Sequence, residues 1–345
     1  MALITDGVDF LKHKFSTENV VQVLKANVDP NLSNGTPYYF QKNIFKQPGI
    51  HNSNYIDVQS LTADFSTIPM VGSMVDAPAL GAESSSFTPH SVEVMAGKFI
   101  VTADDFYNLK KNGLESNGAS WARGKILNGR DVIRRSWEVL NKDAMNGAIS
   151  YPLLTKGKVD TGDKFTLNFG GITTTAQALD WHAAGTTIPQ IVSDLDLQYT
   201  ILEGRGYAPA NASDIVVYVP DATWAYVRAK ALAAYKTQVV NIDINSINEM
   251  VIGPYRLVKN EMNYTAYGAS EVQGLPDKTI QMVNINAQHT CKVLEIPNFK
   301  NQFSASPFQF VVVEDPSGDF IEVKIMTRYI PVPNMSAMIR KTVNS

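Results

Sequence analysis

The sequence of 345 residues contains one cysteine, Cys291, and no apolar run that approaches the ~20 residues a membrane-spanning helix requires. A single cysteine excludes a disulfide within the chain and is typical of a reducing compartment. The N-terminus MALITDGVDF carries Asp6 and Asp9 and no basic residue, so it does not have the pattern of a secretory signal peptide. We therefore expect a protein that is made and folded in a cytosol.

An excess of positive charge is also lacking. The chain has 30 Lys and Arg against 33 Asp and Glu, a formal net charge of −3, which argues against a dedicated nucleic-acid-binding protein. Hydrophobic residues make up 44% and charged residues 18%, an ordinary globular composition. The length is sufficient for two or three compact units.

The common catalytic motifs HExxH, GxSxG and GxGxxG do not occur. The segment from Gly118 to Lys125 approaches a phosphate-binding loop, but it has one residue too many between its glycines. Ile126 also stands where a Ser or Thr has to reach the metal ion. We therefore reject that interpretation.

Isolated titratable residues give no clearer indication of chemistry. The five histidines are scattered singly, without metal-ligand spacing, at positions 13, 51, 90, 182 and 289. We expect Cys291 to be a buried, inert thiol. The carboxylates of Asp104 and Asp105 point apart as neighbours in sequence, and a cap for the helix over 106–111 is the better interpretation. We therefore expect no enzyme, no catalytic residue, no cofactor and no metal site.

The stretch from Gly118 to Gly147 is the most strongly patterned part of the chain. Its apolar residues recur at helical spacing, namely Ile126, Ile133, Trp137, Leu140 and Ala144. Opposite charges four residues apart support an exposed helical face, in the pairs Asp131–Arg135, Arg134–Glu138 and Glu138–Lys142. Gly147 is a plausible C-terminal stop. This pattern predicts a long amphipathic helix over 118–147 that lies across a sheet.

The charge on this helix contrasts with the charge before it. Residues 47–97 have no Lys or Arg, against five acids: Asp57, Asp64, Asp76, Glu83 and Glu93. The predicted helix has six basic residues, Arg123, Lys125, Arg130, Arg134, Arg135 and Lys142, against Asp131, Glu138 and Asp143. The acidic segment and the basic helix are open to three interpretations. They pair within one chain, they pair between copies, or they are surface charges without a partner, since exposed ion pairs contribute little stability.

The other segments have simpler patterns. Residues 1–58 are rich in Asn, Pro and Gly but carry Tyr38, Tyr39, Phe40 and Phe45, which favours an extended arm docked on another surface. Residues 59–102 and 151–171 alternate as two-stranded hairpins. Residues 186–304 alternate helix and strand as an α/β unit does. Strand patterns return around Phe308–Val312, Ile321–Ile325 and Ala337–Val343.

The order of these parts resembles the major capsid proteins of tailed bacteriophages, especially the lambda-type, major capsid protein E-like family with the Hong Kong 97-type fold. The resemblance covers residues 55–340. A strand followed by Pro, and by Trp on the next helix, matches Val219, Pro220 and Trp224, and the end of the long helix matches loosely at Ala144 and Gly147. The other segments that carry it are Phe87-Thr88-Pro89, the hairpin after the long helix, Asp214–Val219 and Ile321–Ile325.

The resemblance implies an α+β fold with four parts. These are an N-terminal arm (1–58), an extended loop (59–102), a peripheral domain (103–185 and 305–345) with its spine helix at 118–147, and an axial α/β domain (186–304). It implies a structural protein of the virion that self-assembles as pentamers and hexamers into an icosahedral shell around double-stranded DNA. The chain begins directly at the arm, without a long charged helical leader, so we expect no scaffold fused to it.

For partners, the resemblance implies other copies of the chain and packaged DNA on the inner face without sequence specificity, with scaffold, portal and decoration proteins as further candidates and no membrane. Assembly is expected in the host cytoplasm. The contacts between subunits are expected at Asp64, Asp76, Glu83, Glu93, Arg123, Arg130, Arg134 and Arg135.

Some relatives join their subunits by a Lys–Asn isopeptide bond with the lysine on the extended loop. This loop has no lysine from Gln47 to Gly97 and only Lys98 at its base, so we expect no such cross-link. Two alternatives remain: a subunit of a cellular protein nanocompartment with the same fold, and a soluble α+β hydrolase or binding module, which a concave polar pocket would favour.

Overall fold

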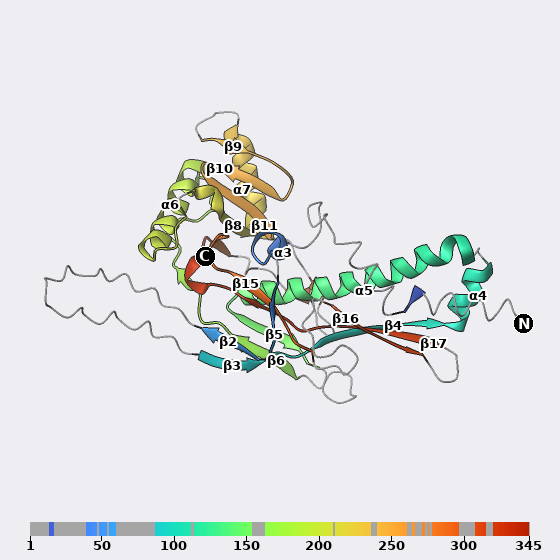
Figure 1. The fold of residues 1–345 in the computed structure, drawn as a ribbon. Helices are drawn as coiled ribbons and strands as arrows, with labels where there is room; N and C mark the ends of the chain where they lie inside the picture. The colour runs from blue at the N-terminus through green and yellow to red at the C-terminus, as the bar shows by residue number, and fades with distance from the viewer. Residues whose placement is uncertain are drawn as a thin grey trace, which may run out of the picture. The chain divides into compact units, whose positions relative to one another are not determined.

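The computed structural model describes residues 14–16, 39–46, 48–53, 55–59, 87–111, 114–153, 163–209, 211–235, 240–260, 264–265, 271–272, 275, 278–296, 308–314 and 320–344 (Figure 1). The chain forms two compact units, which are treated separately. Unit 1 comprises Met1–Ile56, Ser91–Asn141 and Cys291–Pro331. Unit 2 comprises Asp57–His90, Lys142–Thr290 and Val332–Ser345.

Unit 1 contains most of the long helix α5 (Leu114–Met145), whose last four residues belong to unit 2. The expected apolar stripe is confirmed: Ile126, Ile133, Trp137 and Leu140 are buried in unit 1, and Ala144 is buried in unit 2. The helix begins four residues earlier than predicted, and the short helix α4 (Ala103–Lys111) precedes it. Helix α4 begins before the predicted cap, and Asp105 lies in its first turn. Asp105 and Thr102 cap the helix reciprocally: the carboxylate accepts from the Thr102 backbone N–H (3.1 Å) and hydroxyl (3.2 Å), and the Thr102 hydroxyl accepts from the Asp105 backbone N–H (3.2 Å).

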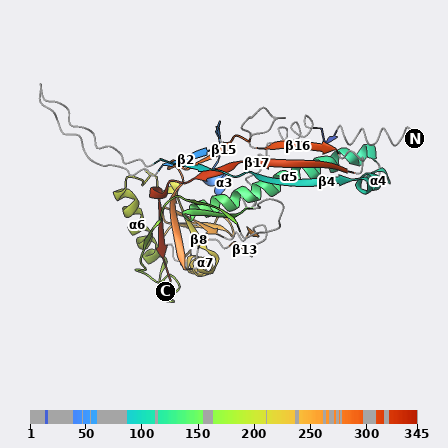
Figure 2. The same ribbon diagram turned by 90° about the horizontal axis from the view of Figure 1, so that it is seen from below.

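A three-stranded antiparallel sheet runs alongside α5 in unit 1, with β17 (Phe320–Thr327) between β16 (Gln309–Glu314) and β4 (Met95–Thr102) (Figure 2). Val323 stands opposite Val312 on one side and Phe99 on the other. The predicted alternation of buried residues on β17 is confirmed. Gly129 explains how closely α5 approaches this sheet, because a Cβ at that position would overlap the Ile325 side chain.

The remainder of unit 1 holds the N-terminal segments. Helix α3 spans Tyr39–Asn43 and strand β1 spans Gly49–His51. Strand β1 pairs in parallel with β15 (Thr290–Leu294), which lies between β1 and β18 (Tyr329–Val332). Phe40 and Phe45 are buried, as expected of aromatic residues on a docked arm.

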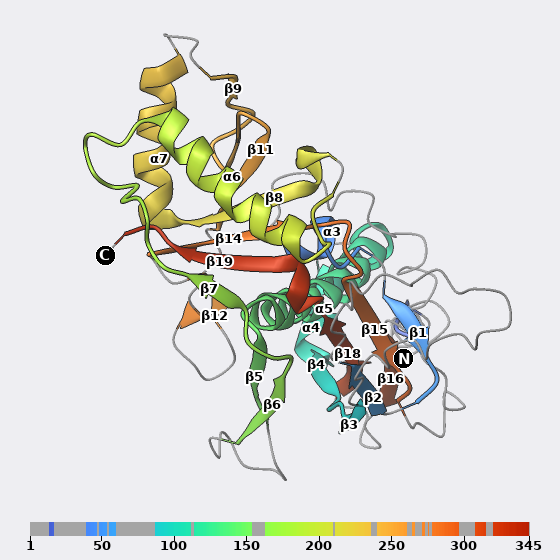
Figure 3. The same ribbon diagram turned by 90° about the vertical axis from the view of Figure 1, so that its left-hand side faces the viewer.

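Unit 2 is built on a seven-stranded mixed sheet in the order β7-β19-β14-β8-β11-β10-β9 (Figure 3). The strands span Thr173–Thr175 (β7), Met338–Thr342 (β19), Thr279–Asn284 (β14), Ile215–Pro220 (β8), Tyr255–Asn260 (β11), Glu249–Ile252 (β10) and Ile242–Asp243 (β9). All six residues of β8 are buried, so the prediction of a short buried strand there is confirmed. Parallel pairing of β8 with β11 is consistent with the helix–strand alternation predicted for this block.

Helices α6 (Ile188–Gly204) and α7 (Asp221–Tyr235) pack on one face of this sheet and share a single core cluster with it. Pro189 lies in the first turn of α6, and the Gln190 side chain accepts a hydrogen bond from the Thr187 backbone N–H at 2.8 Å. The predicted core residues of α7 are confirmed, since Trp224 and Val227 are buried in the cluster. The opposite face of the sheet meets the end of α5, where the Gln281 side chain donates to the Met145 carbonyl at 2.8 Å.

Unit 2 also contains the predicted hairpin after α5. Strands β5 (Ala148–Pro152) and β6 (Lys164–Asn168) pair antiparallel. Gly147 ends α5 with a φ of +99°, as a C-terminal stop requires, and a Cβ there would lie 2.8 Å from the Gly170 carbonyl. Two smaller pairs, β2 (Tyr55–Gln59) with β3 (Phe87–Ser91) and β12 (Tyr264–Thr265) with β13 (Glu271–Val272), and the short 3-10 helices Ala212–Asp214 and Met335–Ala337 complete the described elements.

The domain boundaries expected from the sequence stay a prediction. One strand bears on them directly. Strand β19 pairs with β14 and β7, so the chain segment that follows β17 contributes to the sheet of the predicted axial block. The resemblance grouped that segment with β16 and β17 instead.

Candidate assembly elements

The buried carboxylate of Glu138 holds the N-terminal arm on α5. Glu138 is 0% exposed, and its two oxygens accept hydrogen bonds from the backbone N–H groups of Phe40 (2.6 Å) and Gln41 (3.1 Å). These N–H groups belong to the first turn of α3, where no partner within the helix is available. The Gln41 side chain also donates to the Arg134 carbonyl at 2.9 Å. Segment 39–45 is therefore fastened to α5 through backbone atoms.

Burial dominates the chemistry of this carboxyl group. It raises the pKa of Glu138 to about 8, although the hydrogen bonds from Phe40, Gln41 and Asn141 act in the opposite direction. The neighbouring buried groups belong to the same cluster: the Tyr329 hydroxyl donates to Asn141 Oδ1 at 2.7 Å, and the Tyr329 ring stacks on Trp137 at 4.5 Å. This contact between Glu138 and α3, which we call the Glu138 clamp, is therefore surrounded by buried side chains.

The sequence-based pairing of charges on this helix is wrong at two residues. We expected Glu138 and Lys142 on an exposed face, but both are buried, at 0% and 1% exposure. Burial lowers the pKa of Lys142 to about 8. A periodicity argument treats the side of α5 opposite the apolar stripe as solvated. In unit 1, however, α3 covers Glu138 on that side.

The predicted subunit-contact residues fall into three groups. Asp64, Asp76 and Glu83 lie outside the described residues. Glu93, Arg123 and Arg135 are exposed, and Arg134 is half-buried. Arg130 is 6% exposed and its guanidinium pairs with Asp131 on the same helix at 3.1 Å. Their role between copies stays a prediction.

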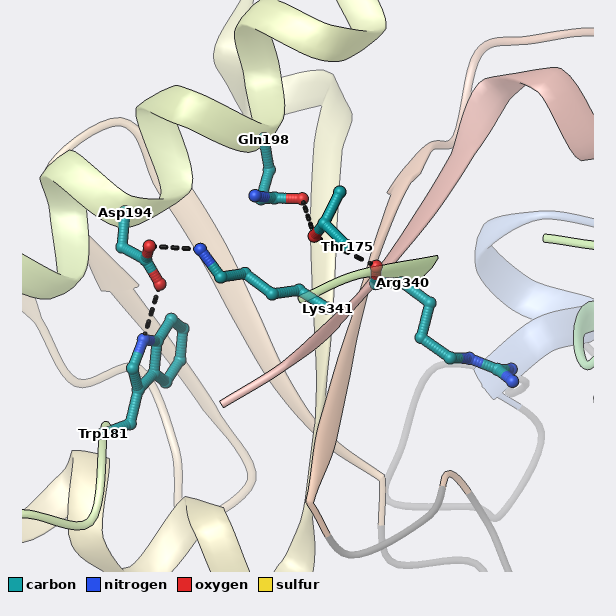
Figure 4. A network of polar contacts seen from close by, with 6 residues as sticks. All are labelled: Thr175, Trp181, Asp194, Gln198, Arg340 and Lys341. Atoms are coloured by element: carbon teal, nitrogen blue, oxygen red, sulfur yellow. Dashed lines mark hydrogen bonds and ion pairs between the residues drawn. The ribbon is translucent and has the colours of Figure 1, made fainter. Parts of the chain in front are cut away.

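A second polar network ties α6 to the edge of the sheet in unit 2 (Figure 4). Asp194 forms a buried ion pair with Lys341 of β19, and it accepts a hydrogen bond from the Trp181 indole N–H at 2.8 Å. One turn along, the Thr175 hydroxyl of β7 donates to Gln198 at 2.9 Å. A buried charge is tolerated only when it is paired and hydrogen-bonded, and both conditions are met here.

A groove on the outer side of α7 was not foreseen from the sequence. It encloses about 330 Å³ between α7 and the loop before β10, and its lining includes Trp224, Arg228, Leu232 and Ile247. Leu232 is 49% exposed and Ile247 is 68% exposed, while Tyr226 and Tyr235 are also exposed on α7. Tyr226 and Leu232 fall off the apolar stripe of α7, and that position is the sequence signal that would have found them. Ile247 lies on the loop before β10, where the sequence has no such pattern.

No arrangement of catalytic or metal-binding groups emerges in the described part of the chain. Within it, no set of three or more His, Cys, Asp or Glu side chains is placed to hold a metal ion. Cys291 is buried, as predicted, and burial raises the pKa of its thiol to about 11. Burial lowers the pKa of His289 to about 4, and the His289 ring accepts from the Asn334 backbone N–H at 3.1 Å.

The structure also bears on the near match to a phosphate-binding loop and on membrane-spanning helices. The segment that approaches a phosphate-binding loop lies inside α5, where its backbone N–H groups form the helix. Across the described elements, none of the helices has the length and apolar character of a membrane span.

Solved structures of capsid proteins share this fold. The putative capsid protein of a prophage of E. coli CFT073 superposes with a TM-score of 0.59 at 16% identity, over 95% of this chain and 98% of that one. The capsid of an empty GTA particle gives a TM-score of 0.50 at 13% identity, over 94% of this chain and 98% of that one. These likenesses show the fold, an α+β capsid fold of the Hong Kong 97 type, as expected.

Sequence comparison gives the family. No match is found among curated protein sequences. The family model described as "Phage major capsid protein E" matches residues 30–344, which is nearly the whole chain. The chain therefore belongs to the phage major capsid protein E family.

Proposed function

We propose that this protein is the subunit from which an icosahedral phage head is built, and that copies of it form pentamers and hexamers around double-stranded DNA. The observation that carries the proposal is the family match over residues 30–344. Membership of that family supports a structural role in the virion. The alternative of a cellular nanocompartment has no comparable support, because the matching family is one of phage proteins.

The architecture of the two units supports an assembling subunit. Unit 2 exposes large apolar side chains on α7 beside a groove, and such surfaces mark protein–protein contacts when they are contiguous. Unit 1 fastens an N-terminal segment to a long helix through Glu138, which supports the assignment of that segment to a docked arm. We assign the contacts around five-fold and six-fold axes to unit 2.

The other partners are proposals of the same kind. The net charge of −3 suits an inner face that contacts packaged DNA without holding it by its phosphates. We place assembly in the host cytoplasm, with scaffold, portal and decoration proteins as the further partners. Empty shells that retained DNA at moderate salt would contradict the assignment of a weakly binding inner face.

Electron microscopy of the purified protein tests the proposal. The chain is expressed alone and then together with the neighbouring genes of its own genome, and both preparations are imaged. Closed shells or tubes of five- and six-membered rings are the expected result, and their presence in the first preparation would also show that no scaffold is needed. A chain that stays monomeric in both preparations would overturn the proposed function.

A further inference from the structure

The groove on α7 has an incomplete lining in the single chain. Leu232 and Ile247 present apolar surface to solvent at 49% and 68% exposure, on either side of the cavity of about 330 Å³. Arg228 lines the same cavity and is half-buried. The groove thus combines exposed apolar surface with one cation.

Helix α6 of the same unit exposes an apolar and an acidic side chain that would complement the groove. Leu197 is 57% exposed, and no Lys or Arg occurs in α6, against Asp194, Asp196 and Glu203. Asp194 is neutralised by Lys341, and Asp196 accepts from the Tyr255 hydroxyl at 2.7 Å. Glu203 is exposed, with no ion pair inside the described chain. The exposed side of α6 thus offers Leu197 near the middle of the helix and Glu203 in its last turn, about 120° apart around the helix axis.

The position of Glu203 is unfavourable for the helix itself. It lies in the last turn of α6, where the negative end of the helix dipole repels a carboxylate, and no basic residue stands in that turn. Helix α7 has the opposite charge balance, with Arg228 and Lys230 against Asp221. Lys230 is occupied by the carbonyls of Ala183 and Thr186, at 2.6 and 2.9 Å. Arg228 is therefore the cation of α7 available to an incoming acid.

We propose that the groove on α7 receives the exposed face of α6 from a second copy of this chain, with Leu197 seated between Leu232 and Ile247 and the Glu203 carboxylate reaching Arg228. This inference rests on the proposed function and names the partner surface within it. The two faces differ, so the contact is heterologous. Such a contact closes into a ring when the rotation that relates one copy to the next is a whole fraction of 360°. Charge complementarity fixes the register of such a contact.

The arrangement of unit 2 allows both faces to be used at once. Helix α6 is tied to β19 and β7 at one edge of the sheet, through Asp194 and Gln198. The groove opens between α7 and the loop that precedes β10, the strand next to the other edge. One subunit therefore offers the acidic face to one neighbour and the groove to the next.

Paired cysteines test the contact. The variant L197C/L232C is oxidised, or treated with a short bismaleimide, and run on a denaturing gel. A disulfide forms when the two Cα atoms lie within about 7 Å. We expect a ladder of covalent multimers that ends at five and six copies. The single variants L197C and L232C are expected to give none, and a mixture of the two to stop at dimers. The wild-type chain, whose only cysteine is the buried Cys291, is the background.

The outcomes separate this inference from the proposed function, because the same preparations are imaged by electron microscopy. Particles without a ladder in L197C/L232C overturn the α6–α7 contact and leave the proposed function standing. Wild-type and variant chains with neither particles nor a ladder, alone or with the neighbouring genes, overturn both. A ladder or dimer from L232C alone shows two grooves in contact and overturns the heterologous arrangement.

Charge reversal tests the ion pair in the same cysteine background. E203R and R228E are each expected to lower the multimer yield by about tenfold, and the combination is expected to restore it. The matched control is K164E, which makes the same charge change as R228E at the exposed start of β6. Failure of the combination to recover, or an equal loss in K164E, overturns the assignment of Glu203 to Arg228.

Discussion

The clamp between Glu138 and α3 should make docking of the arm depend on pH. The pKa of Glu138 is raised from 4.5 to about 8 by burial, so the docked state keeps a proton that an undocked, solvated Glu138 loses near pH 4.5. Between these values the docked state binds more protons, and its stability falls as pH rises, to level off above pH 8. At 1.36 kcal/mol per pH unit, the free energy of docking falls by at most about 5 kcal/mol between the solvated pKa of 4.5 and the buried pKa of about 8.

Amide hydrogen exchange of segment 39–45 in the unassembled subunit measures this effect, after correction for the intrinsic pH dependence of exchange. We expect protection at the amides of Phe40 and Gln41 to fall by up to about a thousandfold between pH 5 and pH 8 in the wild type. In E138Q the titration is absent, so protection should stay flat. At pH 5 the variant should be weaker by about 1 kcal/mol, because an amide NH₂ replaces one acceptor oxygen.

The matched control is E322Q, since Glu322 is an ion-paired glutamate on β17 of the same unit, 2.9 Å from Lys98. It should leave the pH dependence of segment 39–45 unchanged. Parallel pH profiles in wild type and E138Q would show that another group carries the proton and would refute the argument.

Three further predictions follow from the geometry. D194N leaves Lys341 buried without its charge partner and should lower the free energy of unfolding of unit 2 by about 3–5 kcal/mol, measured by urea denaturation. Replacing both Asp194 and Lys341 by apolar residues should recover part of this loss. An equal loss in D194N and in the double variant would contradict the pairing. G147A places a Cβ 2.8 Å from the Gly170 carbonyl at a φ of +99° and should destabilise the chain by ~1–3 kcal/mol, whereas G170A, with open space around it, should cost less. Shells boiled in denaturant should run at the monomer mass of 37.9 kDa, because the chain has no lysine from Gln47 to Gly97 and the extended loop carries only Lys98, at its base; bands above that mass would refute this.

Much of the fold was predictable because the relevant signals are local. The stripe on α5 gives a long helix, the apolar run of β8 gives a buried strand, and Gly147 ends α5 at a positive φ. Hairpins such as β5–β6 follow from alternation on either side of turn residues. In each case neighbouring residues alone decide the structure.

The features that escaped prediction all depend on contacts distant in sequence. Glu138 meets Phe40 across 98 residues, and Asp194 meets Lys341 across 147. A helical pattern shows which side of α5 faces the main core, but it does not show that an arm covers the opposite side. It likewise gives no sign that Ile247, on a loop, completes a groove with Leu232 of α7.

The place of β19 in the sheet has a consequence for synthesis of the protein. This strand lies between β7 and β14, and it supplies the lysine that neutralises Asp194. The ribosome makes β7, α6 and β14 well before it reaches residues 338–342, so a nascent chain holds an open sheet edge and an unpaired buried carboxylate until that point. Unit 2 is completed only when this stretch has been translated. Chains interrupted earlier in synthesis therefore lack a finished unit 2.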